Sequence, residues 1–176
     1  KEMVIDFVHH GDNGPASRWA IHAQPGDELG VAMKAGAKEL YPRVSDYLLA
    51  GDATAIPVLS CILESLPARA SGVCVIEVHG PEDELRIRTA ADIRFIWLHN
   101  PHPEEGSELA ATVKGLVLPE KDRFAYVAAE YRSVKTLREY LRSCGWSKEE
   151  LYAFSYWKAG VAEDQSAQER RAERER

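Results

Sequence analysis

The feature that most constrains the fold is the alternation of short apolar runs with helical patterns between Asp46 and Trp157. The run Val73-Cys74-Val75-Ile76-Glu77-Val78 is nearly continuous and has the length of a strand, which is typical of a strand buried on both faces. Further strands are predicted at 47–50, 94–98, 124–129 and 151–157. Helical spacing predicts helices at 54–66, 107–114 and 133–142, with Thr54 as an N-cap. The order β-α-β-β-α-β-α-β indicates an α/β fold, a parallel sheet with helices on both faces.

The residues before Asp46 show a different pattern. A loose alternation of period two predicts a strand at Met3–His9, and a second short strand is predicted at Glu28–Met33. Between them, Gly11-Asp12-Asn13-Gly14-Pro15 is a dense turn signal, and a helix is expected over 16–23 with Pro15 in its first turn. Gln24-Pro25-Gly26-Asp27 ends that helix.

Composition excludes several classes of function. The 176 residues allow one full domain plus a fragment, and the net charge of −6 argues against a nucleic-acid-binding surface. No apolar run approaches the ~18 residues that a membrane span needs, so no membrane insertion is expected. Three cysteines without a CxxC pair favour reduced thiols and a cytoplasmic location. The charged residues 161–176 are expected to form a solvated helix or a disordered tail, with docking of a partner or dimerisation as the alternative.

Two segments are candidates for binding phosphate groups. A glycine-rich turn that runs into a helix, as at Gly11–Trp19, leaves backbone N–H groups that suit a pyrophosphate, although a plain turn has the same pattern. Ala50–Pro57 opens from a strand end through small residues into a helix, at the edge where open α/β sheets bind ligands. The alternative there is a short βα loop capped by Thr54. Glu130 follows a later strand, and as a single residue it is better explained as a carboxylate that stabilises the next helix.

Other chemistry is poorly supported by the residues. His9-His10 and the His99-Asn100-Pro101-His102 pair lack a third ligand at a known spacing, so they are interpreted as turn residues and no metal site is expected. No nucleophile–base arrangement stands out, and no catalytic side chain is expected. Aromatic residues near the end of the chain alternate on a predicted strand, where one face could cover a planar ring.

Four stretches together resemble the siderophore-interacting proteins, flavin-dependent ferric-siderophore reductases of the ferredoxin-reductase superfamily. They are Asp6–Ala20, Gln24–Asp27, Tyr47–Pro57 and Ser155–Gly160, within a similarity that runs from about Val4 to Gly160. The resemblance implies a ferredoxin-reductase-type NAD(P)-binding sheet over 46–160, preceded at 1–36 by trailing β-strands of a flavin-binding antiparallel barrel with its pyrophosphate helix. It implies that most of this barrel would precede residue 1.

The resemblance also implies an activity. Hydride passes from NAD(P)H to FAD, and single electrons then reduce ferric iron in a siderophore, the expected partner, so that the iron is released. The residues that would hold the cofactors are His10, Gly14, Pro15, Ala16, Ser17, Trp19, Gly51, Asp52, Thr54, Ala55, Ile56, Ala129, Glu130, Tyr156 and Trp157. Lys158 would face the siderophore.

Three departures from the family pattern accompany the missing barrel strands. Ala129 stands where the family usually has glycine, Lys158-Ala159 stands where two basic residues are common, and Ala32–Gly36 alters a glycine-rich loop. Two alternatives stay open: another flavin-dependent NAD(P)H oxidoreductase of the superfamily, or a non-catalytic binding module. Arg86, Arg88 and Arg132 are candidates for contact with the 2′-phosphate that distinguishes NADPH from NADH. The siderophore and the oligomeric state are not indicated by the sequence.

Overall fold

A computed structural model describes residues 3–5, 7, 12, 14–32 and 41–161. The chain divides into two units, Lys1–Lys38 and Glu39–Arg176. Within the described ranges, no helix combines the length and the apolar character needed to cross a membrane.

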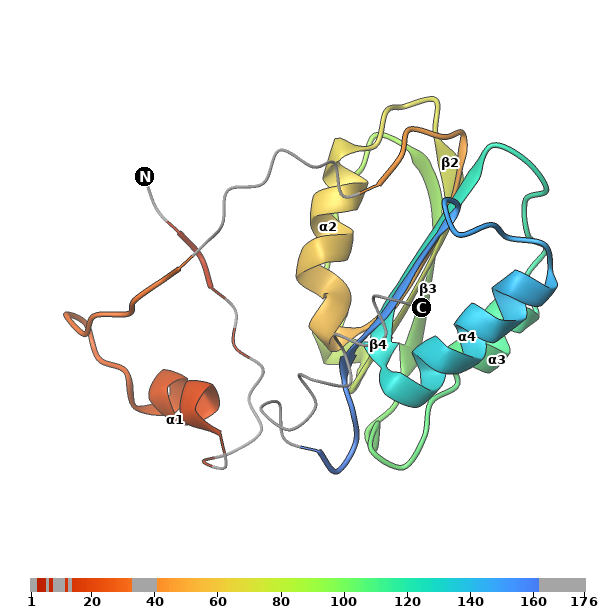
Figure 1. The fold of residues 1–176 in the computed structure, drawn as a ribbon. Coiled ribbons are helices and arrows are strands. Elements are labelled where there is room, and N and C mark those ends of the chain that lie inside the picture. The colour runs from red at the N-terminus through yellow and green to blue at the C-terminus, as the bar shows by residue number, and fades with distance from the viewer. Residues whose placement is uncertain (1–2, 6, 8–11, 13, 33–40, 162–176) are drawn as a thin grey trace. The chain divides into compact units, whose positions relative to one another are not determined.

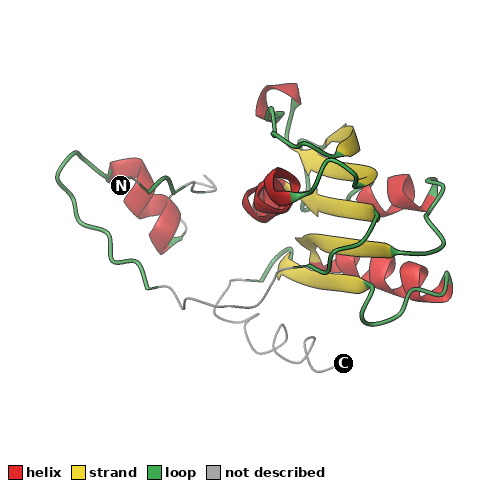
Figure 2. Ribbon diagram, turned by 90° about the horizontal axis from the view of Figure 1, so that it is seen from above, coloured by secondary structure: helices red, strands yellow, loops and turns green. Residues whose placement is uncertain are grey.

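The second unit is built on a five-stranded parallel sheet in the order β3-β2-β1-β4-β5 (Figures 1 and 2). The strands are β1 (Asp46–Asp52), β2 (Ser71–Val78), β3 (Asp92–His99), β4 (Arg123–Glu130) and β5 (Leu151–Trp157). The neighbouring pairs are all parallel. The α/β fold with a parallel sheet, expected from the alternation of strands and helices, is therefore confirmed.

Helices cover both faces of this sheet, as the sequence indicates. Helix α2 (Ile56–Ser65) lies on one face, and α3 (Leu109–Lys114) and α4 (Tyr131–Ser143) lie on the other (Figure 2). Side chains alternate along β1, so that Tyr47 and Leu49 join the apolar cluster under α2 whereas Leu48 and Ala50 join the cluster under α3 and α4. Both clusters are buried, which explains why the strands have nearly continuous apolar sequences.

The starts of two helices differ from the sequence prediction. The prediction that Thr54 caps the helix after β1 is wrong, because the side chain of Asp52 accepts a hydrogen bond from the Thr54 N–H and so begins a short 3-10 turn, η1 (Ala53–Ala55). Helix α3 begins at Leu109 rather than Ser107, whose hydroxyl accepts the Leu109 N–H. A second 3-10 turn, η2 (Pro81–Asp83), lies in the connection from β2 to β3.

The first unit contains helix α1 (Pro15–His22), with proline in its first turn as expected. Strands predicted at Met3–His9 and Glu28–Met33 are not found at residues 3–5, 7 and 28–32, and the other positions of these predictions lie outside the described residues. A strand needs a hydrogen-bonded neighbour, and none of the described strands pairs with these segments. The side chains of Met3, Val4 and Ile5 are exposed, so alternation alone does not produce a strand here.

Candidate functional site

The connections that leave the carboxyl ends of β1 and β4 run to opposite faces of the sheet. These two strands are neighbours, yet the chain leaves β1 toward the α2 face and leaves β4 toward the α4 face (Figure 2). Loops that diverge in this way leave a crevice, which is where open α/β sheets bind their ligands. The sequence-predicted residues Gly51, Asp52 and Thr54 lie at the end of β1, and Ala129 and Glu130 lie at the end of β4.

Asp52 is the centre of a buried hydrogen-bond network at this edge. One carboxylate oxygen accepts the N–H of Thr54 at 3.0 Å and its hydroxyl at 2.5 Å. The other accepts the Glu130 N–H at 2.9 Å and the Trp157 indole N–H at 2.7 Å. Four donors from three separate parts of the chain therefore converge on a single side chain, which joins the ends of β1, β4 and β5.

Asp52 forms no ion pair with any described basic side chain. The residue is 7% exposed, and burial raises the pKa of its carboxyl group although the hydrogen bonds from Thr54, Trp157 and Glu130 oppose that shift. Hydrogen-bond donors, rather than a basic side chain, thus replace the water that this carboxylate has lost.

Glu130 connects β4 to both α4 and the end of the described chain. It is the N-cap of α4, and its side chain accepts the Arg132 N–H at 2.5 Å, which confirms the helix-stabilising interpretation. Its other oxygen accepts the Ala159 N–H at 3.2 Å. The next residues are linked as well, because the Lys158 ammonium lies 5.0 Å from the centre of the Tyr131 ring. The segment after β5 is therefore attached to the start of α4.

Tyr156 and Trp157, predicted to share a role, point to different surroundings. A bulge in the β4–β5 pairing sets Trp157 opposite Glu130, and its indole reaches Asp52. Tyr156 instead packs against the cluster on the α2 face, with its hydroxyl 3.2 Å from that of Tyr126. The Tyr126 ring stacks on that of Tyr152 at 4.3 Å, so β5 presents an aromatic row to the α2 face.

The small residues at the end of β1 contribute to packing. A Cβ atom at Gly51 would lie 2.6 Å from Ala55 Cβ and 2.8 Å from the Ala128 carbonyl oxygen, so the absent side chain leaves room for the protein's own atoms. Ala55 is fully buried, and Ile56 packs against the core under α2. Ala129 is also buried, at 1% exposure, on the α4 side of the sheet. Gly51, Ala55 and Ile56 therefore set how closely α2 approaches the sheet, whereas Ala129 packs on the opposite face.

A hollow of about 130 Å³ opens beside the start of α4. It lies between that helix and the connection from β3 to α3, and its lining residues are Pro103, Glu104, Gly106, Ser107, Ala110, Glu130, Arg132, Ser133 and Thr136. The connection is held by Glu77 at the end of β2, whose carboxylate accepts hydrogen bonds from the Asn100 amide, the Ser107 hydroxyl and the Glu108 N–H. Most of this wall was not predicted, because the lining residues follow no spacing that marks a site.

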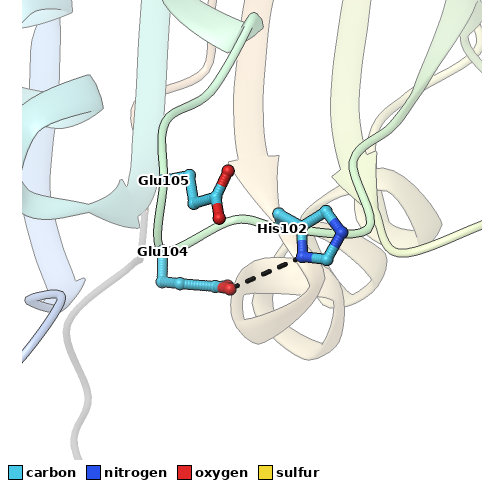
Figure 3. Close-up of side chains that lie close together, drawn as sticks. All are labelled: His102, Glu104 and Glu105. Atoms are coloured by element: carbon cyan, nitrogen blue, oxygen red, sulfur yellow. Dashed lines mark ion pairs between the residues drawn. The ribbon is translucent and has the colours of Figure 1, made fainter.

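The same connection carries a histidine and two glutamates. His102, Glu104 and Glu105 are exposed, and their potential ligand atoms lie within 4.8 Å of one another (Figure 3). The His102 ring lies 3.6 Å from the Glu104 carboxylate. The structure does not combine the two members of the HxxH pair, because His99 bonds to Glu84 at 2.8 Å.

The candidate flavin segment is in the first unit. Gly14 is the N-cap of α1 and provides no side-chain cap, and Pro15 and Ala16 in the first turn are exposed. Ser17 is buried at 2% exposure, and the Trp19 ring lies 5.7 Å from that of Phe7. His10 lies outside the described residues. A helix start without a side-chain cap retains backbone N–H groups that suit an anion.

Comparison with protein families gives two matches along the chain. The model described as "Siderophore-interacting FAD-binding domain" matches residues 1–37, and the model described as "Siderophore-interacting protein" matches residues 44–160. One match falls within each of the two units.

Individual relatives agree with these matches. The ferric vibriobactin reductase ViuB of Vibrio cholerae is 34% identical over 172 residues, which are 96% of this chain and 64% of the relative. The mycobactin import ATP-binding/permease protein IrtA of Mycolicibacterium smegmatis is 33% identical over 92% of this chain and 19% of its own length. The chain thus spans less than two thirds of either relative.

Solved structures show the same similarity. The siderophore-interacting protein SipS from Aeromonas hydrophila superposes with a TM-score of 0.86 at 30% identity, over 97% of this chain and 67% of that one. A siderophore utilization protein from T. fusca superposes with a TM-score of 0.80 at 32% identity, over 89% of this chain and 60% of that one.

Proposed function

The chain belongs to the siderophore-interacting protein family, and from this membership we propose that it is part of a ferric-siderophore reductase. In the proposed reaction, electrons pass from NAD(P)H through FAD to ferric iron bound by a siderophore, whose weaker ferrous complex releases the metal. The observation that carries the proposal is that a match to a siderophore-interacting FAD-binding domain is followed, in the same chain, by a parallel sheet with an open switch-point edge. The domain division that we propose is 1–36 for the flavin part, 46–160 for the nucleotide part and 161–176 for a charged tail.

The start of α1 fits a flavin pyrophosphate. Gly14 leaves the first turn without a side-chain cap, and the exposed Ala16 presents little bulk to a ligand. When bound, FAD supplies the conversion of a two-electron donor into single electrons. In this proposal, the backbone N–H groups of Gly14, Ala16 and Ser17 bind the phosphates, whereas Pro15, which has no N–H, fixes the first turn, with His10 and Trp19 beside them.

The carboxyl edge of the sheet fits a nicotinamide nucleotide. The loops after β1 and β4 diverge there, and the hollow beside α4 lies at the end of β4. In this proposal the backbone from Gly51 to Ile56 and from Ala129 to Glu130 lies along the nucleotide. Gly51 acts by allowing the close approach of α2 to the sheet, since its missing Cβ is replaced by the atoms of Ala55 and Ala128.

Asp52 and Glu130 are assigned a positioning role. Their carboxylate oxygens already accept hydrogen bonds from Thr54, Arg132, Trp157 and the backbone at Ala159, among others. A diphosphate would be repelled by two negative charges, so we propose that these side chains orient the loops and the indole rather than contact the cofactor. Their rigidity keeps Trp157 and Lys158 fixed next to the nucleotide edge.

The segment after β5 is assigned to the acceptor. Lys158 supplies a positive charge for an anionic ferric siderophore, and Trp157 supplies a flat apolar surface near the flavin. Both are held at the same edge by Asp52 and Glu130, through the Trp157 indole and the Ala159 N–H. The free thiols of Cys61, Cys74 and Cys144 agree with the reducing cytoplasm that we propose as its location.

The test combines a flavin titration with turnover. The full-length protein is titrated with FAD, and the oxidation of NADH and NADPH is then followed with a ferric siderophore or with free flavin as the acceptor, while a chelator reports ferrous iron. We expect flavin binding and siderophore-dependent formation of ferrous iron. Preference for free flavin would instead support a general flavin reductase, and absence of both flavin binding and turnover would support a non-catalytic binding module.

A variant of Lys158 tests the acceptor site within the same assay. K158Q is expected to raise the KM for the siderophore about threefold without changing the KM for the nucleotide. Lys135, exposed in the middle of α4, provides the matched control K135Q. Equal effects of the two variants would contradict the assignment of Lys158.

A further inference from the structure

The connection from β3 to α3 carries three metal-ligating side chains that no step of the proposed reaction uses. They are His102, Glu104 and Glu105, whose potential ligand atoms all lie within 4.8 Å of one another. Figure 3 shows the Glu104 carboxylate turned toward the His102 ring, and the Glu105 carboxylate lies near both. One imidazole nitrogen and two carboxylates form a mixed nitrogen and oxygen ligand set, which suits divalent transition-metal ions.

The distances fit two ligands of one ion better than they fit a direct contact. Nδ1 of His102 lies 3.6 Å from Oε1 of Glu104, which is longer than a hydrogen bond. A divalent transition-metal ion binds such ligands at about 2.1 Å, so two ligands of the same ion lie about 3 to 4 Å apart. All three side chains are exposed, so a small rotation of Glu105 brings its carboxylate into the same range.

The charges of the two carboxylates are not balanced by a basic side chain in the described part of the chain. Glu104 has only the His102 ring as an ion-pair partner there, and the described lysines and arginines form no ion pair with Glu104 or Glu105. Two carboxylates this close repel each other unless a cation lies between them. The imidazole distinguishes the cluster from a purely acidic one, because Mg²⁺ and Ca²⁺ take oxygen ligands whereas imidazole selects transition-metal ions.

The cluster is also held in place by residues outside it. Glu77, at the end of β2 and only 4% exposed, accepts hydrogen bonds from the Asn100 amide at 3.1 Å and from the Ser107 hydroxyl at 2.9 Å. Asn100 precedes the three ligands in the chain and Ser107 follows them. The segment that carries the ligands is thus attached to the sheet at both ends, which lowers the entropy that a bound ion must overcome.

The position of the cluster relates it to the acceptor. Glu104 and Glu130 line the same hollow, and the Glu130 carboxylate accepts the Ala159 N–H at 3.2 Å. Ala159 follows Lys158, the residue assigned to the siderophore. Iron that leaves a siderophore at Lys158 is therefore released beside the hollow to which Glu104 belongs.

We infer that His102, Glu104 and Glu105 form a binding site for a divalent transition-metal ion, and that this site receives the ferrous ion that siderophore reduction releases. The inference rests on the proposed function, since that reaction supplies the ion. The iron arrives already reduced, so it exchanges water ligands for protein ligands and no electron is transferred at the cluster. Exposure of all three side chains leaves the remaining coordination positions to water and allows the ion to depart again.

Calorimetry with Fe²⁺ alone tests the site without siderophore or nucleotide. The full-length protein is titrated under anaerobic conditions, and one bound ion is expected. H102Q, E104Q and E105Q each remove one ligand. Loss of a residue that merely supports a ligand already costs about tenfold in metal affinity, so each variant is expected to weaken Fe²⁺ binding by at least about tenfold.

Two matched controls remove the same kinds of side chain from outside the cluster. Glu108 is exposed on the same connection, and His79 is exposed directly after β2. E108Q and H79Q are expected to bind Fe²⁺ as the unaltered protein does, and unchanged thermal unfolding establishes that every variant is folded. The inference is overturned if the unaltered protein binds no Fe²⁺, or if the controls lose as much affinity as the ligand variants.

Delivery of iron to the cluster is measured after anaerobic reduction of a siderophore that carries radiolabelled iron. The unaltered protein and E108Q, once separated from small molecules, are expected to retain label that a ferrous-specific chelator removes, and E104Q is expected to retain much less. Equal retention by E104Q and E108Q would overturn the receiving role.

The two proposals can fail separately. Siderophore reduction without Fe²⁺ binding at the cluster would leave the reductase proposal in place and show that the metal site is wrong. Selective Fe²⁺ binding without siderophore reduction would support the metal site and contradict the proposed function, together with the source of iron that it supplies.

Discussion

The two ends of the sheet hold buried charge in different ways. At the amino end of β4, Arg123 is 9% exposed and donates hydrogen bonds to the Glu150 carboxylate and to the Pro119 and Gly145 carbonyl oxygens. Its guanidinium also lies 4.2 Å from the centre of the Trp146 ring. At the carboxyl end, Asp52 is equally buried, but every donor that the described residues offer it is neutral.

This difference separates stability from function. The Arg123 guanidinium has an ion-pair partner and stacks on an aromatic ring, and these contacts stabilise the loops at the amino end of the sheet. The carboxylate of Asp52 accepts hydrogen bonds from neutral groups and so fixes the positions of those donors. Its negative charge is not neutralised, and it lies next to the loops that diverge. The amino end is therefore expected to respond to substitution mainly in stability, and the carboxyl end in both stability and activity.

The largest effect is expected from R123M. The substitution leaves the Pro119 and Gly145 carbonyl oxygens and the Glu150 carboxylate without their donor, so the free energy of unfolding should fall by about 4 kcal/mol. Urea unfolding measures this, with R69M at an exposed position as the control. Turnover of the folded fraction should stay unchanged, and a selective loss of activity would break the comparison.

A smaller loss of stability is expected from D52N. The donors that now bond to the two carboxylate oxygens of Asp52 would share the single acceptor oxygen of asparagine. At least one donor then stays unpaired, so the free energy of unfolding should fall by about 3 kcal/mol. Here the activity should change as well, because the Trp157 indole loses its anchor, and the tryptophan emission should shift.

The matched control for D52N is D46N, at the other end of the same strand. The Asp46 side chain accepts one hydrogen bond, from the Ser71 hydroxyl at 2.7 Å, and its amide replacement should cost about 0.5 kcal/mol. A D52N protein with unaltered emission and turnover would remove the distinction between the two ends.

Packing at the carboxyl end is tested by G51A. The added Cβ would lie 2.6 Å from Ala55 Cβ and 2.8 Å from the Ala128 carbonyl oxygen, so α2 must move and the free energy of unfolding should fall by about 2 kcal/mol. At Gly115, where the nearest atom is 3.4 Å away, alanine should change stability by less than about 0.5 kcal/mol. Thermal unfolding compares the two variants, and equal Tm values would contradict the tight fit.

The smallest effect is a pH dependence of opposite sign at the two ends. The Ser147 N–H and the Arg123 guanidinium lower the pKa of Glu150, so its stabilisation is present above the ordinary value of 4.5 and is lost as the pH falls through the folded-state pKa. Burial raises the pKa of Asp52, so its contribution is present below the ordinary value of 3.8 and is lost as the pH rises through the folded-state pKa.

Unfolding measured from about pH 3 to 7 separates these contributions. E150Q should lose less stability than the unaltered protein on acidification, and D52N should lose less as the pH rises above the acid range. Identical pH profiles for the three proteins would show that neither carboxyl group is coupled to folding as described.

Much of the fold was accessible from the sequence because it depends on local periodicity. The apolar run at 73–78 and the helical spacing at 133–142 each correspond to an element that buries the predicted side chains, here β2 and α4. Alternation at residues 3–9 has the same local form, yet the described residues there form no strand, because a strand depends on a partner that its own sequence does not encode.

The candidate site was only partly accessible for the same reason. The ends of predicted strands can be located from the sequence, and they include Gly51, Asp52 and Glu130. The bond from Trp157 to Asp52 joins residues 105 apart in the chain, and one hollow is lined both by Ser107 and by Ser133. Contacts of this kind are decided by how β1, β4 and β5 lie next to one another.

The sequence by itself determined which segments become strands and helices, the family to which the chain belongs and the strand ends that carry its motifs, because hydrophobic period and turn chemistry act over a few residues. Only the tertiary structure decided which carboxylates are already committed to the protein's own donors and which elements those donors come from. Hydrogen-bond satisfaction depends on what neighbouring elements bring within about 3 Å, and that is a property of packing rather than of any local pattern.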